Sequence, residues 1–196
     1  MEYVKLGNSP LTVSRLCVGC MSFGDPASRM HAWTLDPAES EEIVKHALSL
    51  GINFFDTANT YSAGTSEEYL GRAIRSNVPR DQVILASKVY FNEGHLSREA
   101  ILREIDGTLQ RLGTDYLDLY IIHRFDADTP VEETMEALDS LLPGADVVAM
   151  SLPGNPSTYH ILNRERIALL SPGTIVLNAG RGTAIDTDAL CEALYA

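Results

Sequence analysis

The sequence lacks most of the features that would direct a chain to an oxidising compartment or a membrane. Its three cysteines, Cys17, Cys20 and Cys191, are too few and of the wrong parity for a disulfide framework, which favours a reducing compartment. No apolar run approaches the roughly 20 residues that a membrane helix requires, and the start MEYVKLGNSP has no basic segment followed by an apolar one. These absences predict a soluble cytoplasmic protein.

Positive charge is also scarce. The chain has 15 lysines and arginines against 27 aspartates and glutamates, which gives a formal net charge of -12. An acidic surface repels the phosphates of nucleic acids and the anionic faces of membranes. We therefore expect neither nucleic acid nor membrane as a partner.

The 196 residues are 45% hydrophobic, enough for one substantial core in a single domain. Helix signals are legible at three places: Asp36-Pro37 followed by Glu39, Ser97 with a closing Gly113, and Thr129-Pro130 followed by Glu132. Short apolar runs lie between them: RLCVG, INFF, QVILAS, LDLYII, DVVAMS and TIVLNA. Alternating apolar runs and helices predict an α/β fold.

Such continuously apolar runs are typical of parallel strands covered on both faces. We predict six consecutive βα units that form one parallel sheet, with the strands in chain order, over residues 1–196 as a single domain. Six units are too few for an eight-stranded (β/α) barrel, so the sheet is either open or an incomplete barrel. Its two edge strands could then pair with a second copy of the chain.

Three ionisable residues stand at or just past the ends of consecutive predicted strands: Asp56, Lys88 and His123. Because the carboxyl ends of parallel strands share one face, these residues can converge, together with Tyr61 from the loop after Asp56. Each alone could be a turn residue, a strand-end charge, a satisfied histidine or a loop aromatic. Together they suit proton transfer to a carbonyl oxygen, since an ammonium stabilises a neighbouring phenolate and a histidine can polarise the same oxygen.

Residues 1 to about 138 resemble the N-terminal half of an aldo-keto reductase, on the segments GINFFDTANTYSAGTSEEYLGRAI, ILASKVY and LQRLGTDYLDLYIIHRFD. The resemblance implies that Tyr61 is the proton donor, that Asp56, Lys88 and His123 complete a catalytic tetrad, and that the substrate is an aldehyde or ketone. It also implies NADP(H) as the cofactor. Trp33, in the loop GDPASRMHAWTLD, would line part of the substrate pocket.

Residues from about 138 to 196 resemble a different family, the D-isomer-specific 2-hydroxyacid dehydrogenases, late in their Rossmann-type NAD-binding domain. That resemblance implies that Arg181 orients a substrate carboxylate, and that Pro153, Asn178 and Gly180 lie near the nicotinamide of NAD(H). The glycines around Arg181 can also be interpreted as a simple strand-to-helix turn. No G-x-G-x-x-G phosphate-binding pattern follows any predicted strand, so we expect an incomplete cofactor site whose binding is doubtful.

The two resemblances make residues 136–150 a candidate seam between an aldo-keto-reductase-like half-barrel and a Rossmann-like segment, residues 139–196. We therefore predict a fold chimera of two oxidoreductase fragments with little or no catalysis. The alternative is an NADP(H)-dependent aldo-keto reductase that acts on aldehydes or ketones. A third hypothesis is an NAD-dependent D-2-hydroxyacid dehydrogenase.

Overall fold

The structure is a computed structural model that describes residues 1–6, 9–141, 147–150, 159–160, 162–168, 170, 175–178 and 182–194. Its strands are β1 (Tyr3–Lys5), β2 (Thr12–Ser14), β3 (Val18–Gly19), β4 (Phe54–Asp56), β5 (Ile84–Val89), β6 (Leu119–Ile122), β7 (Val147–Met150) and β8 (Ile175–Asn178). Its α-helices are α1 (Pro37–Ser49), α2 (Thr65–Asn77), α3 (Arg98–Leu112), α4 (Val131–Leu141), α5 (Arg164–Ile167) and α6 (Thr187–Leu194). Short 3-10 turns are η1 (Pro26–Ser28), η2 (Tyr61–Gly64), η3 (Arg80–Gln82) and η5 (Gly182–Ala184).

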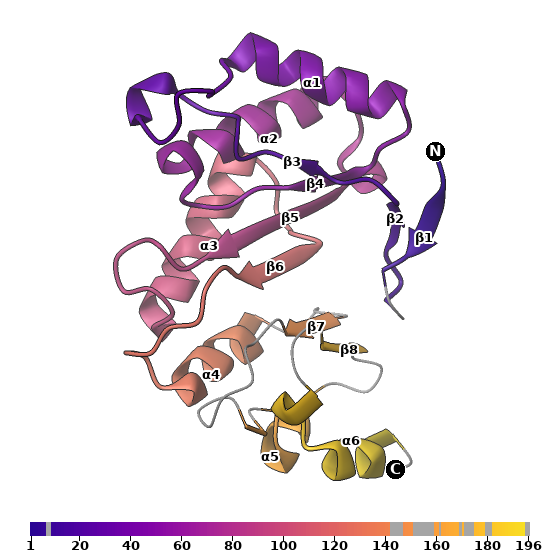
Figure 1. The fold of residues 1–196 in the computed structure, drawn as a ribbon, viewed down its shortest axis with the longest axis vertical. Helices are drawn as coiled ribbons and strands as arrows, with labels where there is room; N and C mark the ends of the chain where they lie inside the picture. Colours follow the sequence, from indigo (N-terminus) through magenta and orange to yellow (C-terminus); the bar gives the residue numbers. More distant parts are fainter. Residues whose placement is uncertain are drawn as a thin grey trace.

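Four strands form a parallel sheet in chain order, β3-β4-β5-β6. Helices α1, α2 and α3 connect these strands, and together they make the upper part of the molecule in Figure 1. We call β3–β6 with α1–α3 the N-terminal body. The predicted α/β fold with a parallel sheet is confirmed here.

The prediction of one continuous six-stranded sheet is wrong. Within the described residues, β7 and β8 pair in parallel with each other and form a separate two-stranded sheet. Together with α5 and α6 they form what we call the C-terminal part, which lies below the N-terminal body in Figure 1. Hydrophobic runs specify that a segment is a strand, but not which edge it joins, so the sequence pattern could not reveal this break.

Helix α4 joins the two parts through side-chain bonds rather than through strand pairing. On one side, the Thr134 hydroxyl donates to the Leu96 carbonyl over 2.9 Å, and Glu133 accepts from the backbone N–H of Arg98 over 2.9 Å. On the other side, Glu132 accepts from the Arg166 guanidinium over 2.7 Å. The helix therefore contacts both the N-terminal body and the C-terminal part.

A small antiparallel hairpin of β1 and β2 precedes the sheet, and the sequence pattern did not predict it. The backbone N–H of Ser14 donates to the side-chain oxygen of Asn53 over 2.7 Å, and the Asn53 N–H donates to the Ser14 hydroxyl over 3.2 Å. The hairpin is thereby fastened to the residue just before β4.

Helix boundaries follow the capping signals where those exist. Asp36 and Glu39 form the predicted capping box of α1, Ser97 caps α3, and Gly113 ends α3 in the left-handed conformation with φ 67°. Helix α2 starts instead at Gly64, which has no side chain to mark the start, so no capping signal predicted this helix.

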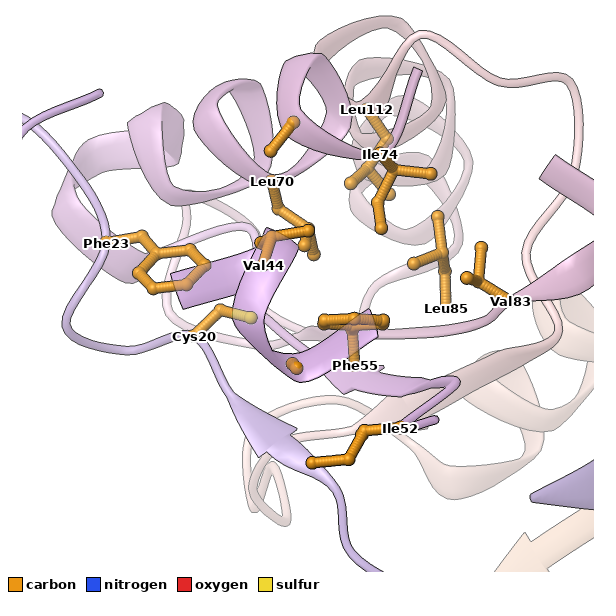
Figure 2. Close-up of a cluster of buried hydrophobic side chains, with 12 residues drawn as sticks. Cys20, Phe23, Val44, Ile52, Phe55, Leu70, Ile74, Val83, Leu85 and Leu112 are labelled. Atoms are coloured by element: carbon orange, nitrogen blue, oxygen red, sulfur yellow. The ribbon is translucent and has the colours of Figure 1, made fainter. Parts of the chain in front are cut away.

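The core of the N-terminal body lies between β4, β5 and the helices (Figure 2). Phe55 and Leu85 point from neighbouring strands toward Leu70 and Leu112 of α2 and α3, and all four side chains are buried. Cys20 is fully buried in the same cluster, which supports a packing role for this thiol. Helices α2 and α3 cross closely at Gly71, where a Cβ atom would stand 2.2 Å from the Leu112 carbonyl oxygen.

Among the described residues of the C-terminal part, Leu162, Ile167, Ala184 and Ala189 form a cluster of buried side chains. Val131 of α4 packs against it. No helix among the described residues is long and apolar enough to cross a membrane.

Candidate active site

The register of the parallel sheet brings Asp56 and Lys88 to one face. Asp56, the last residue of β4, pairs in register with Ala86 of β5, and Lys88 follows two residues later. Because side chains alternate along a strand, Ala86 and Lys88 point to the same face, while Leu85 and Val89 point into the core. The carboxylate and the ammonium therefore meet at the carboxyl end of the sheet.

The Lys88 ammonium uses all three of its protons. It donates to Asp56 Oδ2 over 2.6 Å, to the Thr57 carbonyl over 2.7 Å and to the Tyr61 hydroxyl over 3.2 Å. The Lys88 and Asp56 side chains are only 13% and 29% exposed, so water competes weakly for this ion pair. An ammonium with three fixed acceptors is held in one place beside the Tyr61 oxygen.

Tyr61 begins the tight turn η2, which is supported by the loop between β3 and α1. Ser62 and Ala63 both have left-handed backbone angles, with φ 48° and 55°. The Ser62 N–H donates to the Met30 sulfur over 2.9 Å, and Gly24 approaches so closely that a Cβ atom there would stand 2.2 Å from the Ser62 Cβ. The loop between β3 and α1 thus holds the turn that presents the Tyr61 hydroxyl.

His123 follows β6 directly, and its backbone N–H continues the ladder by donating to the Val89 carbonyl over 3.0 Å. Its ring packs edge-on against Tyr61, with centroids 5.6 Å apart. Burial lowers the pKa of His123, the Lys88 ammonium lowers it further, and Asp56 opposes them in part. The imidazole is therefore neutral near pH 7, and its buried Nδ1 has no hydrogen-bond partner among the described residues.

The other predicted site residues are not brought to this cluster by any contact of the described chain. Trp33 is 52% exposed and stacks on His31, with ring centroids 4.1 Å apart. Asn178 is the last residue of β8. Pro153, Gly180 and Arg181 lie outside the described residues.

Three residues at the site were missed by the sequence interpretation. Phe91 is 48% exposed and packs edge-on against His123, with ring centroids 5.0 Å apart. Asn59 is buried, and its amide donates to the carboxylate of Glu104 on α3 over 2.9 Å. The sequence does contain a signal for Glu104, because this charged residue stands on the buried face of its helix. It follows Ile101 by three residues and precedes the buried Thr108 by four.

A cavity of about 470 Å³ lies elsewhere, between α2, α3 and the start of β5. Its lining includes Arg75, Arg80 and Leu112, and none of the four predicted tetrad residues. Arg75 donates to the Leu112 carbonyl, and Arg80 pairs with Asp118 over 2.6 Å. Both guanidinium groups therefore already have protein partners. Among the described residues, no group of three histidine, cysteine, aspartate or glutamate side chains could hold a metal ion.

Comparison with known proteins identifies the family of this chain. The family model described as the aldo/keto reductase family matches residues 15–143, which include all four clustered residues. This chain belongs to the aldo/keto reductase family. A second model, the NAD binding domain of the D-isomer specific 2-hydroxyacid dehydrogenases, matches residues 101–196.

Individual relatives extend the similarity. Versiconal hemiacetal acetate reductase of Aspergillus parasiticus is 40% identical over 166 residues, which are 72% of this chain and 48% of that protein. Aldo-keto reductase YhdN of Bacillus subtilis is 36% identical over 178 residues, 88% of this chain and 51% of that protein. The crystal structure of the thermostable aldo-keto reductase Tm1743, solved with the inhibitor epalrestat, is 29% identical with a TM-score of 0.68, and covers 91% of this chain and 62% of that one. The chain spans about half the length of the curated relatives it matches.

These findings overturn the prediction of a chimera with little or no catalysis. An alignment that covers 88% of the chain cannot end at residue 143, so the similarity to an aldo-keto reductase continues past the expected seam. The two family models also overlap over residues 101–143, so they define no junction at residues 136–150. The expectation of doubtful cofactor binding is likewise unsupported, because the family uses nicotinamide cofactors.

Proposed function

We propose that this chain carries the catalytic residues of a nicotinamide-dependent carbonyl reductase that acts on small aldehydes or ketones. The observation that carries the proposal is the Lys88 ammonium, which bonds the Tyr61 hydroxyl over 3.2 Å and the Asp56 carboxylate over 2.6 Å. The names of relatives agree in kind, since they include a reductase of versiconal hemiacetal acetate and a putative aryl-alcohol dehydrogenase.

Tyr61 is the proton donor in this proposal. Lys88 donates to the tyrosine oxygen, which leaves the hydroxyl proton of Tyr61 free to point at a substrate oxygen. As that proton moves to the carbonyl oxygen, negative charge develops on the phenolate, and the adjacent ammonium stabilises it. Asp56 keeps the ammonium in position and does not itself exchange a proton.

His123 orients and polarises the carbonyl. A neutral imidazole carries one N–H, which can donate to the same oxygen that receives the proton from Tyr61. The pKa of His123 is lowered by burial and by Lys88, which keeps the ring neutral and leaves the proton transfer to Tyr61. The edge-on packing of the two rings supports a shared target.

The cluster supplies a proton and hydrogen-bond donors but no hydride, which fits a nicotinamide cofactor as the reductant. When bound, that cofactor supplies the hydride for the carbonyl carbon. We propose NADP(H) or NAD(H), with Pro153, Asn178 and Gly180 as contacts, and Trp33 and Arg181 as substrate contacts. These five assignments rest on the sequence resemblances.

We also propose that residues 1–196 act as a single α/β domain. The bonds of α4 support this proposal, because Glu133 binds Arg98 of the N-terminal body and Glu132 binds Arg166 of the C-terminal part.

The test combines cofactor binding with the Tyr61→Phe variant. We expect NADPH or NADH to bind the folded protein in calorimetry, and Tyr61→Phe to lower kcat/KM for an aldehyde by about 10²–10⁴-fold, the usual contribution of a general acid. Cofactor affinity should not change, because the ring is retained. Tyr116→Phe is the matched control, since Tyr116 lies outside the cluster and stacks under Arg80. A fully active Tyr61→Phe, or folded protein that binds neither cofactor, contradicts the proposal.

A further inference from the structure

Glu104 is a buried carboxylate on α3, and its partners come from the loops of the candidate active site. Its side chain belongs to a residue only 7% exposed, where a charge is costly unless it is hydrogen-bonded. Three side chains satisfy it: the amides of Asn59 and Asn92 and the guanidinium of Arg103. The carboxylate is therefore built into the protein rather than solvated.

One oxygen of this carboxylate joins the two loops. Glu104 Oε2 accepts from Asn59 over 2.9 Å and from Asn92 over 2.6 Å, while Arg103 binds Oε1 over 3.1 Å. Asn59 lies in the loop after β4 and Asn92 in the loop after β5. Both amides thus donate to the same oxygen atom, Glu104 Oε2.

Asn59 is linked directly to a tetrad residue, and Asn92 is linked to another through Phe91. Asn59 stands between Asp56 and Tyr61 in the chain, and its backbone N–H donates to the Lys88 carbonyl over 3.2 Å. Asn92 follows Phe91, whose ring packs against His123 with centroids 5.0 Å apart. A displacement of either amide would move a loop that holds the reacting groups.

The negative charge of Glu104 determines which way the amides of Asn59 and Asn92 face. Burial acts to raise the pKa of this carboxyl, but the bonds from Asn59, Asn92 and Arg103 outweigh it and hold the pKa below its usual range. An ionised carboxylate only accepts hydrogen bonds, so it fixes both amides with their NH₂ groups inward. A glutamine at this place would turn its own NH₂ either toward the two amides or toward Arg103, and one side would lose its acceptor.

We propose that Glu104 is a positioning residue. Through Asn59 it holds the Tyr61 turn over Lys88, and through Asn92 it holds Phe91 against His123. Its consequence for turnover rests on the proposed reductase function. Its consequence for the geometry of the two loops does not, so the two can be tested apart.

The first experiment follows the His123 imidazole by NMR during a pH titration, with the resonance assigned from a His123→Gln variant. In Glu104→Gln we expect the midpoint of His123 to rise toward its ordinary value, because release of the loops exposes the ring and separates it from Lys88. Simple loss of a negative charge would shift the midpoint the other way, since an anion favours protonated histidine. Asp56 and Lys88 remain in both proteins as the charges that act on this ring.

Glu99→Gln is the matched control, because Glu99 is an exposed carboxylate in the first turn of the same helix. It should leave the His123 midpoint unchanged. If Glu104→Gln does not fold, Asn92→Ala removes one of the two amide donors and should give a smaller shift in the same direction. An unchanged or lowered midpoint in a folded Glu104→Gln or Asn92→Ala variant overturns the proposal.

The second experiment measures reduction of an aldehyde with NADPH. Misplacement of a catalytic group by about 1 Å costs up to about 100-fold in rate, so we expect kcat of Glu104→Gln to fall by about 10- to 100-fold. The KM for the aldehyde should change less than about 2-fold, since Glu104 does not face the substrate. If the parent protein is inactive while the His123 midpoint still moves, the reductase function fails and the positioning role stands. Equal kcat in parent and variant overturns the role in turnover.

Discussion

The N-terminal body and the C-terminal part are built from the same alternation of strand and helix, yet their described sheets and buried clusters differ in size. In the N-terminal body, four strands and three helices enclose a cluster that includes Phe55, Leu70 and Leu85, each no more than 1% exposed. In the C-terminal part, the described strands form only a pair, and four of the described residues belong to a buried cluster. Among the described residues, the same βα alternation therefore gives local strand pairing in both parts, but a four-stranded sheet only in the N-terminal body.

The largest expected effect is on the core of the N-terminal body. Phe55→Ala should lower the free energy of unfolding by about 3–5 kcal/mol, because the ring is fully buried against two helices. Ile167→Ala, in the C-terminal part, should cost about 2 kcal/mol, at the low end for a buried isoleucine, because its cluster is smaller.

Urea unfolding measures both variants, with Trp33 fluorescence as a probe of the N-terminal body and circular dichroism as a probe of all helices. Trp33 is the single tryptophan of the chain. If Ile167→Ala shifts the Trp33 transition as far as it shifts the circular dichroism transition, the two parts unfold as one unit and the contrast between them is lost.

An intermediate effect is expected at the crossing of α2 and α3. Gly71→Ala places a Cβ atom 2.2 Å from the Leu112 carbonyl oxygen, so the helices must separate at a cost of about 1–3 kcal/mol. Gly182→Ala is the matched control in the C-terminal part, since no atom lies within 4 Å of the added Cβ. Thermal unfolding should show a lower Tm only for Gly71→Ala. An unchanged Tm for Gly71→Ala would mean that α2 and α3 can move apart at their crossing without loss of stability.

The smallest expected effect concerns acid stability. Burial acts to raise the pKa of Asp126, but hydrogen bonds from the Thr129 hydroxyl and the N–H groups of Asp128 and Leu96 outweigh it and lower the pKa. A carboxyl whose pKa is depressed by folding stabilises the native state above its unfolded pKa of about 3.9, and this contribution is lost as the pH falls through the folded value. The N-terminal body should therefore lose stability below about pH 4.

Asp126→Asn should make the free energy of unfolding less dependent on pH, as measured by urea unfolding between neutral pH and about pH 3. Glu192→Gln in the C-terminal part should leave it unchanged, because the Glu192 side chain is 61% exposed and its pair with Arg164 lies in solvent. If the free energy of unfolding falls equally steeply with decreasing pH in Asp126→Asn and in the parent protein, this carboxyl does not control acid stability.

Much of the N-terminal body could be predicted from the sequence, because its signals are local. Asp36 with Glu39, Ser97 and Gly113 mark helix ends through bonds to residues a few positions away, and the structure has these bonds. The convergence of Asp56, Lys88 and His123 followed from the rule that parallel strands share their carboxyl ends. Their roles in catalysis stay a prediction.

The rest depended on contacts between distant parts of the chain. Gly64 starts α2 without a side-chain cap, so that helix had no capping signal. The bond from Asn59 to Glu104 joins residues 45 positions apart, and no periodicity pairs them. The separation of β7 from β6 was missed for the same reason, since an apolar run carries no information on the edge it will join.

The order of strand pairing in the N-terminal body has a consequence for biosynthesis. Each strand from β4 to β6 pairs with the strand that was translated just before it, and Lys88 finds both Asp56 and Tyr61 in segments already made. His123 is the last of the four clustered residues to leave the ribosome. Because chains fold from the N-terminus during synthesis, the whole cluster can begin to assemble before β7 has left the ribosome.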